Sequence, residues 1–430
     1  MFNKLFNIIT LGLILSTSVA VNAAENWPQF RGTTGFGYST EKNLTFQWGG
    51  PSNNNVLWKS PLIGSGHASP IIWFDKVFVC TVKWQGDGKP DPNVIPDQHV
   101  VCYRTADGKL LWDTIIKPGP WLRKDFRSGA GGGYAGPTPV TDGKLVYCVF
   151  GSSVMAALDF NGKLIWRKEI VPSSFDVTIG SSPVLFQDTV IMLSAMADKN
   201  DSNVTAFNKT NGEIKWRKMF PDMGFAHSTP VLITVKDKPQ LLVLASGMGI
   251  KDNALRSLDP ATGETLWWCK GAGDASSPAH GSGIVYFDSG RGGRGVAVDP
   301  TGSGDVTSTN IRWSGPQIPE AINSPIFVGS YVYRLVNTGD LKCWEVATGK
   351  EVYSKQLDGI TSTWASPIAD GDGRLYFASA GKSYVVQSGP DFRVLAVNDL
   401  GDANHPSPAI SQGHIFLVGM KYLYCIGPAK

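Results

Sequence analysis

The chain has 430 residues, of which 17% are charged and 49 are glycine, and its formal net charge is +3. The basic residues are spread along the chain without a Lys/Arg stripe, which argues against nucleic acid or an anionic membrane as a partner. The low charged fraction and the abundance of glycine are expected of a protein with many turns and closely stacked sheets.

The first 24 residues have the features of a secretory signal peptide. Lys4 precedes an apolar stretch over residues 8–19, and small residues follow at 20–24. We expect cleavage near Ala23 or Ala24 and export to the periplasm or beyond. The apolar stretch is too short for a stable membrane anchor, no comparable stretch follows, and no cysteine precedes Cys80. We therefore expect no transmembrane segment and no lipoprotein, with residues 25–55 as an extension and 56–430 as one domain.

Pairs of Ser-Pro or Thr-Pro recur through the rest of the chain, and their prolines are 69, 44, 47, 48, 47, 42 and 41 residues apart. A period in the forties is typical of a β-propeller. Because proline cannot donate to a strand ladder, it is confined to strand starts and edges. We predict that each pair opens the innermost strand of one of eight four-stranded blades. The pairs are Ser69-Pro70, Thr138-Pro139, Ser182-Pro183, Thr229-Pro230, Ser277-Pro278, Ser324-Pro325, Ser366-Pro367 and Ser407-Pro408.

Each repeat contains two alternating apolar runs, a turn with glycine and an aromatic or apolar anchor. In the second unit the runs 144–150 and 154–160 precede Asn161-Gly162 and Trp166. Such turns indicate antiparallel hairpins. Tyr353 and Leu395 occupy the anchor position in the last two complete units. The tryptophans that we expect to fill the wedges between blades are Trp58, Trp112, Trp166, Trp216, Trp267 and Trp313.

Trp58 comes before the first Ser-Pro pair, so its blade has no preceding strands. The last unit, after Ser407-Pro408, offers only the short runs 415–418 and 422–426 before the chain stops. The two fragments complement one another. We predict that the strand around Trp58 becomes the outer strand of the eighth blade, which closes the ring and removes its open edges.

The six cysteines do not form an evident disulfide framework. Cys80 and Cys148 share one repeat position, and Cys102 and Cys343 share another. This placement indicates small buried strand residues, and no CxxC or Cys-His cluster has zinc spacing. A bridge between Cys80 and Cys102 stays open, because exported proteins form disulfides.

One face of such a propeller carries the loops that lead into the inner strands, and loops on a rigid scaffold commonly carry function. A histidine beside a Ser-Pro turn either satisfies a backbone carbonyl or contacts a ligand; paired metal ligands at a fixed spacing are missing. Arg291 and Arg294 either grip a carboxylate or quinone oxygens or tie their loop to its neighbour. The ligand-face candidates are His67, Arg127, His227, Asp274, Arg291, Arg294, Asn323, Trp364 and His405.

The segments 158–166, 257–267 and 344–350 resemble the tryptophan-docking repeat of the pyrroloquinoline-quinone (PQQ) propeller superfamily. Trp27-Pro28-Gln29-Phe30-Arg31-Gly32 also resembles the opening of many secreted bacterial members. The resemblance covers nearly all of the chain after Trp58. It implies one of two kinds of function. One is that of the quinoprotein alcohol dehydrogenases, which hold PQQ and calcium in the channel, and the other is that of the scaffold lipoprotein of the outer-membrane β-barrel assembly machine.

The cysteines of this chain differ from those of both groups. The dehydrogenases typically carry a disulfide between adjacent cysteines, and no two cysteines adjoin here. The scaffold lipoprotein has a lipidated cysteine at its processed N-terminus, whereas this chain has no cysteine before Cys80. We predict an all-β, eight-bladed, monomeric and exported PQQ-like propeller. We expect it to bind a protein, small molecule or glycan, or to act as a scaffold, without a catalytic centre, metal or cofactor of its own. The alternative is a PQQ-dependent oxidoreductase for alcohols or sugars, with PQQ and calcium in the channel.

Overall fold

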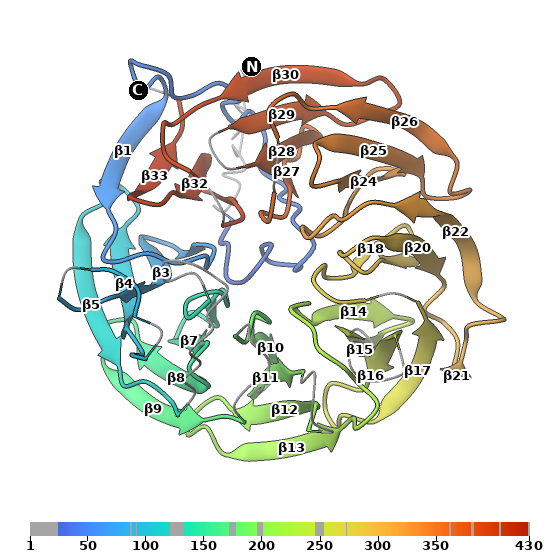
Figure 1. The fold of residues 1–430 in the computed structure, drawn as a ribbon, viewed down its shortest axis with the longest axis horizontal. Coiled ribbons are helices and arrows are strands. Elements are labelled where there is room, and N and C mark those ends of the chain that lie inside the picture. Colours follow the sequence, from blue (N-terminus) through green and yellow to red (C-terminus); the bar gives the residue numbers. More distant parts are fainter. Residues whose placement is uncertain are drawn as a thin grey trace, which may run out of the picture.

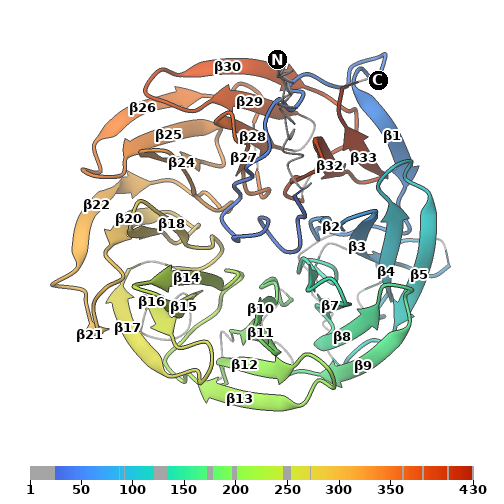
Figure 2. The same cartoon turned by 180° about the vertical axis from the view of Figure 1, so that it is seen from behind.

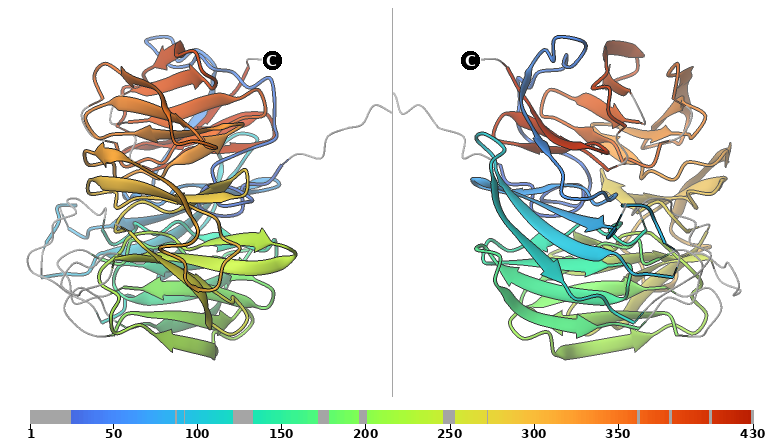
Figure 3. Two further views of the ribbon diagram at one scale, coloured as in Figure 1. Left: turned by 90° about the vertical axis from the view of Figure 1, so that its right-hand side faces the viewer. Right: turned by 60° about the vertical axis from the view of Figure 1, so that its left-hand side comes forward.

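The computed structural model describes residues 25–428 except 87, 92, 121–132, 172–177, 196–200, 246–252, 272, 361–362, 380–381 and 404–405. Eight antiparallel sheets stand around a central axis as the blades of a propeller (Figure 1). Seen from the side, the ring is a thick disc with loops on both faces (Figure 3). In the described part of the chain, no helix has the length and apolarity needed to cross a membrane. The predicted all-β, eight-bladed fold is confirmed.

The strands of each blade follow one another from the axis outward. From innermost to outermost, blade 1 contains β2 (Ile71–Trp73), β3 (Lys76–Lys83), β4 (Asp97–Arg104) and β5 (Leu110–Ile116), and blade 2 contains β6 (Val140–Thr141), β7 (Leu145–Phe150), β8 (Val154–Asp159) and β9 (Leu164–Glu169). Blade 3 contains β10 (Val184–Phe186), β11 (Thr189–Ser194), β12 (Asn203–Asn208) and β13 (Ile214–Met219). Blade 4 contains β14 (Val231–Val235), β15 (Lys238–Ala245), β16 (Ala254–Leu258) and β17 (Thr265–Lys270), with β21 (Gly304–Asp305) added outside β17. In the same order, blade 5 contains β18 (Ala279–Gly281), β19 (Ile284–Phe287), β20 (Gly293–Val298) and β22 (Ile311–Ile318), and blade 6 contains β23 (Ile326–Val328), β24 (Tyr331–Leu335), β25 (Asp340–Glu345) and β26 (Glu351–Gln356). Blade 7 contains β27 (Ile368–Ala369), β28 (Arg374–Ala378), β29 (Ser383–Gln387) and β30 (Arg393–Asn398). Blade 8 contains β31 (Ala409–Ser411), β32 (His414–Val418), β33 (Tyr422–Ile426) and, as its outermost strand, β1 (Val56–Pro61).

The prolines of the repeat lie where the sequence predicts. In every blade the innermost strand begins at or just after the residue that follows the proline of its Ser-Pro or Thr-Pro pair, as Ile71 follows Pro70. The innermost strand pairs on one side only, so a residue without an N–H donor is tolerated at its start.

The ring closes through the first strand of the chain, as predicted. β1 pairs antiparallel with β33, with Trp58 opposite Cys425 and Pro61 opposite Tyr422. The first and last strands therefore share blade 8, and residues of β1 and β33 pack in one hydrophobic cluster with blade 1.

Five tryptophans join their blades to the next through the predicted turns. The Trp112 indole donates to the Phe160 carbonyl at 3.0 Å, and a Cβ on Gly162, whose φ is +82°, would lie 2.7 Å from the Trp112 ring. A β-bulge next to Ala157 lets Trp166 point inward while Ile165 stays 42% exposed. The same indole-to-carbonyl bond joins Trp58, Trp166, Trp216 and Trp313 to the following blade.

Trp267 is an exception to this docking pattern. It is fully buried, but its indole donates to Gln240 Oε1 within its own blade. The turn of blade 5 that would otherwise dock on it is enlarged, and its segment β21 pairs in parallel with β17 (Figure 1). A short strand thus replaces the indole bond at this blade interface.

Residues 25–55 start beside blade 8, cross one face to the axis and return along blade 7 to β1 (Figure 2). They contact the inner strands just after the prolines: Trp27 forms a bridge with Ile72, and the Thr141 N–H donates to the Pro28 carbonyl. The fully buried Arg31 donates to the carbonyls of Phe36 and Pro325. Burial, followed by the charge of the nearby Arg334, lowers the pKa of Arg31 to about 9.

All six cysteines are buried free thiols, so Cys80 and Cys102 form no bridge. Cys80 lies opposite Val100, and Cys102 lies opposite Phe78. Burial raises the pKa of Cys102 to about 12, against a smaller lowering by Lys76, so this cysteine stays a neutral thiol. The interpretation as small buried strand residues is confirmed.

Candidate ligand-binding site

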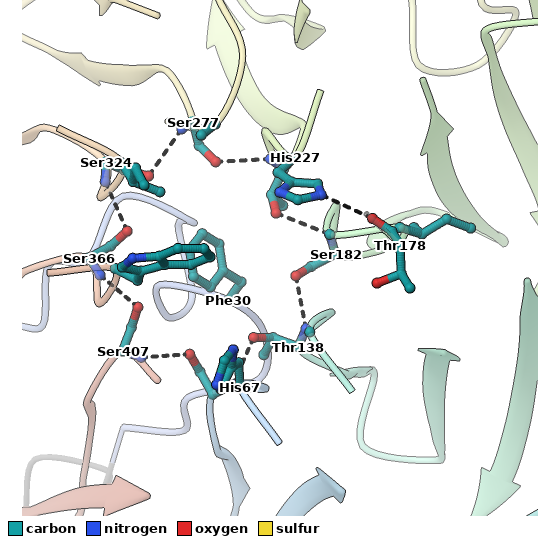
Figure 4. A pocket seen from close by; sticks show the side chains of 18 of the residues that line it. Phe30, His67, Thr138, Thr178, Ser182, His227, Ser277, Ser324, Ser366 and Ser407 are labelled. Atoms are coloured by element: carbon teal, nitrogen blue, oxygen red, sulfur yellow. Dashed lines mark hydrogen bonds between the residues drawn. The ribbon is translucent and has the colours of Figure 1, made fainter. Parts of the chain in front are cut away.

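The hydroxyl groups of the eight Ser-Pro and Thr-Pro pairs form a closed ring around the axis (Figure 4). In each blade the backbone N–H of the Ser or Thr donates to the side-chain oxygen of the equivalent residue in the next blade. Ser407 N–H donates to Ser69 Oγ at 3.0 Å and closes the circle. The other seven links run from Ser69 to Thr138, Ser182, Thr229, Ser277, Ser324, Ser366 and Ser407 in order, at 2.9–3.0 Å.

This ring gives a testable prediction at Thr229, whose side chain accepts from the Ser182 N–H. Thr229→Val keeps the shape but leaves that buried N–H without its acceptor. The expected loss is about 1–3 kcal/mol in the free energy of unfolding, measured by urea denaturation. Thr229→Ser, which keeps the oxygen, is the matched control; equal losses in the two variants would contradict a role for the hydrogen bond.

A cavity of about 440 Å³ lies on the axis, and all eight ring residues line it. This volume falls in the range of small-molecule sites. Phe30, from the N-terminal extension, lies within the outline of the ring (Figure 4). The extension contacts the inner strands after the prolines, whereas His67, His227 and Trp364 precede their Ser-Pro or Thr-Pro pairs. Phe30 therefore forms the floor of the cavity, and the loop-bearing face forms its walls and mouth.

His67 and Trp364 line the cavity together, one from the first repeat and the other from the seventh. Their ring centroids are 6.4 Å apart with an interplanar angle of 62°, which is an edge contact and not a stack. Trp364 is 48% exposed. A large aromatic surface is thus available to a ligand in the cavity.

His227 lines the opposite part of the cavity and is held at both its backbone and its ring. Its N–H donates to the Asp274 carbonyl at 2.9 Å, and its Nε2 lies 2.9 Å from the Thr178 carbonyl. A carbonyl can only accept, so Nε2 carries the proton and Nδ1 presents a lone pair. Burial, with a smaller effect of Arg291, lowers the pKa of His227 to about 4 against the opposing Thr178 bond. The imidazole is therefore neutral at neutral pH.

The low pKa of His227 has a consequence for stability. Between its ordinary pKa of 6.5 and its folded value of about 4, the unfolded chain binds the proton and the folded chain does not. Stability attributable to His227 is therefore present above pH 6.5 and falls as the pH drops toward 4, by about 2–3 kcal/mol. Urea unfolding at pH 7 and pH 4.5 should show a smaller acid loss in His227→Gln than in the wild type; parallel losses would contradict this assignment.

Asp274 and Arg291 form an ion pair beside the cavity. Arg291 Nε lies 3.0 Å from Asp274 Oδ2, and Arg291 Nη1 lies 3.5 Å from Glu320 Oε1. Burial raises the pKa of Asp274 against the lowering effect of Arg291. The pair ties its loop to the neighbouring one, which is one of the two alternatives that the sequence leaves open for Arg291. Arg294 occupies an exposed position on β20, opposite Gln317.

Asn323 is a structural residue. It is buried, donates through Nδ2 to the Leu335 carbonyl and accepts from Arg334 Nη1. Arg334 in turn forms a fully buried ion pair with Asp288 at 2.8 Å. Of the predicted candidates, the structure thus brings His67, His227 and Trp364 to the cavity. Arg127 and His405 lie outside the described residues.

Two contributors to the cavity escape prediction from the sequence. Phe30 stands out only as part of the opening motif, and no motif marks Thr178, which fixes the tautomer of His227. The residues of the hydroxyl ring can be identified from the sequence, because they are the Ser and Thr of the repeated pairs. Their hydrogen bonds from blade to blade cannot be predicted from it.

Comparison with known proteins identifies the superfamily. A family model of PQQ-type repeats, described as outer membrane protein assembly factor BamB, matches residues 96–355 and 238–398, more than half of the chain. The chain belongs to this family of PQQ-like propellers.

Curated relatives of this PQQ-like propeller include a dehydrogenase. The quinoprotein ethanol dehydrogenase of Pseudomonas aeruginosa is 25% identical over 264 residues, which are 58% of this chain and 36% of that protein. The propeller thus spans about a third of the length of this curated relative.

Solved structures share the fold at low identity. BamB from Moraxella catarrhalis has a TM-score of 0.61 and 12% identity over 87% of this chain and 97% of that one. A europium-containing methanol dehydrogenase has a TM-score of 0.67 and 11% identity over 93% of this chain and 90% of that one. At these identities the likeness concerns the fold alone.

The described cavity residues of this PQQ-like propeller do not fit PQQ with calcium. Calcium takes six to eight oxygen ligands, commonly including carboxylates, and PQQ itself carries carboxylates that call for cationic partners. The cavity lining includes no Asp, Glu, Lys or Arg among the described residues. The described part of the chain also holds no cluster of three or more His, Cys, Asp or Glu arranged to bind a metal ion.

Proposed function

We propose that this protein is an exported binding protein that holds a small ligand in its axial cavity. The observation that supports the proposal most directly is a cavity of about 440 Å³ floored by Phe30, ringed by hydroxyl groups and faced by a half-exposed tryptophan. A concave site with an apolar surface and a few fixed polar groups is the usual form of a small-molecule site.

The ring that lines the cavity is well suited to binding. Each hydroxyl is fixed by a bond from the preceding blade, so its position is set before a ligand arrives. A preorganised site loses less conformational entropy when it binds. A rigid site also favours one ligand shape, whereas a flexible site adapts to several.

Ligand-observed NMR with the mature full-length protein tests this function. A library of small metabolites, including PQQ with calcium, is screened against the wild type and Trp364→Ala. We expect at least one compound whose signal is lost in the variant. Trp268→Ala, on the outer strand β17, controls for a general effect of removing an indole. Absence of any compound sensitive to Trp364 would overturn the proposal.

The oxidoreductase alternative is tested in the same samples. The quinoprotein relative favours it, whereas the described cavity donors do not. A dye-coupled oxidation assay with alcohols and sugars, run after addition of PQQ and calcium, is expected to show no turnover above the protein-free rate. Saturable binding of PQQ accompanied by turnover would replace the binding function with the enzymatic one.

A further inference from the structure

The eight ring hydroxyls have protons that the blade-to-blade bonds do not use. Each Ser or Thr oxygen in the ring accepts a backbone N–H, and a hydroxyl can accept and donate at the same time. Among the described residues, none of the eight donates its hydroxyl proton to a protein acceptor within hydrogen-bond distance. All eight line the cavity and are 2–4% exposed, so their hydroxyl groups form a narrow band of potential donors around the axis.

The cavity also offers an acceptor and an aromatic surface. His227 presents the lone pair of Nδ1, because Nε2 donates to the Thr178 carbonyl. Trp364 is 48% exposed and meets His67 only at an edge, which leaves aromatic surface to cover the apolar face of a ring. A rigid indole provides such contact area with little loss of side-chain entropy.

The described lining carries no carboxylate, ammonium or guanidinium group. It contains no acidic or basic side chain other than the two histidines, and His227 is neutral. Beside the lining, Arg291 already faces two carboxylates, those of Asp274 at 3.0 Å and Glu320 at 3.5 Å. A charged ligand would lose hydration in this cavity without gaining a counter-charge, which costs binding free energy.

From these observations we infer that the cavity binds a neutral sugar, with the ring hydroxyls donating to its oxygens, His227 accepting from one of its hydroxyls and Trp364 stacked on its ring. A sugar hydroxyl both donates and accepts, which matches a lining of hydroxyls. Its C–H faces are apolar, which matches an indole. The inference rests on the proposed binding function and gives it a ligand class.

Calorimetric titration of the mature full-length protein tests the ligand class. The probes are glucose, galactose, N-acetylglucosamine, maltose and cellobiose, with glucuronate and glucosamine as charged counterparts of similar shape. We expect saturable binding of at least one neutral sugar and at least about tenfold weaker binding of its charged counterpart. Trp364→Phe should retain most of the affinity, and Trp364→Ala should lose about tenfold or more.

His227→Phe removes the acceptor while keeping an aromatic ring of similar size. It should weaken sugar binding, and Trp268→Ala should leave it unchanged. Thermal unfolding of each variant checks that a lost signal does not come from a lost fold.

The two proposals fail in different ways. If no neutral sugar binds but a library compound of another class binds in a Trp364-dependent manner, the sugar inference is wrong and the binding function stands. If the charged sugars bind as tightly as the neutral ones, the argument from charge is wrong. If nothing binds in a Trp364-dependent manner, both proposals fail.

Discussion

Replacing Arg334 with methionine is expected to lower the free energy of unfolding by about 3–5 kcal/mol. The Arg334 guanidinium is fully buried and forms two 2.8 Å bonds with the Asp288 carboxylate. It also donates to the carbonyls of Ala321 and Asn323. The substitution leaves a buried carboxylate without its counter-charge, and that uncompensated charge accounts for most of the loss. Equilibrium denaturation in urea measures it.

A double variant separates the charge effect from the loss of packing. Asp288 Oδ1 also accepts from Ser276 Oγ at 2.9 Å and from the Gly290 N–H at 3.0 Å. An asparagine can keep these two bonds while removing the charge. Asp288→Asn combined with Arg334→Met should therefore be more stable than Arg334→Met alone. If the double variant were the less stable of the two, the buried charge would not be the cause.

Trp58→Ala is expected to cost about 3–5 kcal/mol, the usual range for removing a large aromatic side chain from a packed site. The Trp58 indole donates to the Thr105 carbonyl at 2.8 Å. Its ring lies 6.1 Å from Phe416 and packs under Gly108. The substitution therefore weakens blade 8 and its contact with blade 1 together. Thermal and urea unfolding measure the loss.

The neighbouring residue supplies the control for Trp58. Leu57 lies on the same strand and is 38% exposed. Leu57→Ala should change the free energy of unfolding by no more than about 0.5 kcal/mol. Limited proteolysis should also cleave Trp58→Ala faster than Leu57→Ala. The propeller opens most readily in blade 8, because β1 is held to β33 there by non-covalent contacts alone. Equal cleavage rates would contradict a role of Trp58 in closure.

Much of the fold could be predicted because the repeat encodes local chemistry. A proline marks the start of each inner strand, a glycine turn marks each hairpin, and a tryptophan marks most outer strands. The orphan strand around Trp58 and the incomplete last unit predicted closure, since an open blade edge is unfavourable. Trp267 departs from the pattern because an enlarged turn in the next blade supplies β21, and nothing in the repeat indicates that a turn will pair with a neighbouring sheet.

The candidate site was only partly predictable. Position beside a Ser-Pro pair places a residue near the axis, but it does not say whether its side chain turns toward the cavity or between the blades. His227 and Trp364 turn to the cavity, whereas Asp274 and Asn323 are held by arginines from other segments. Those arginines are 17 and 11 residues away in the chain, and no local pattern links them to their partners.

The position of Phe30 and β1 has a consequence for biosynthesis. Both segments leave the ribosome early, but β1 finds its partner β33 only near the end of the chain. The last hydrogen bond of the ring joins residues 338 positions apart. The propeller and its axial cavity can therefore be completed only after the final blade has been synthesised.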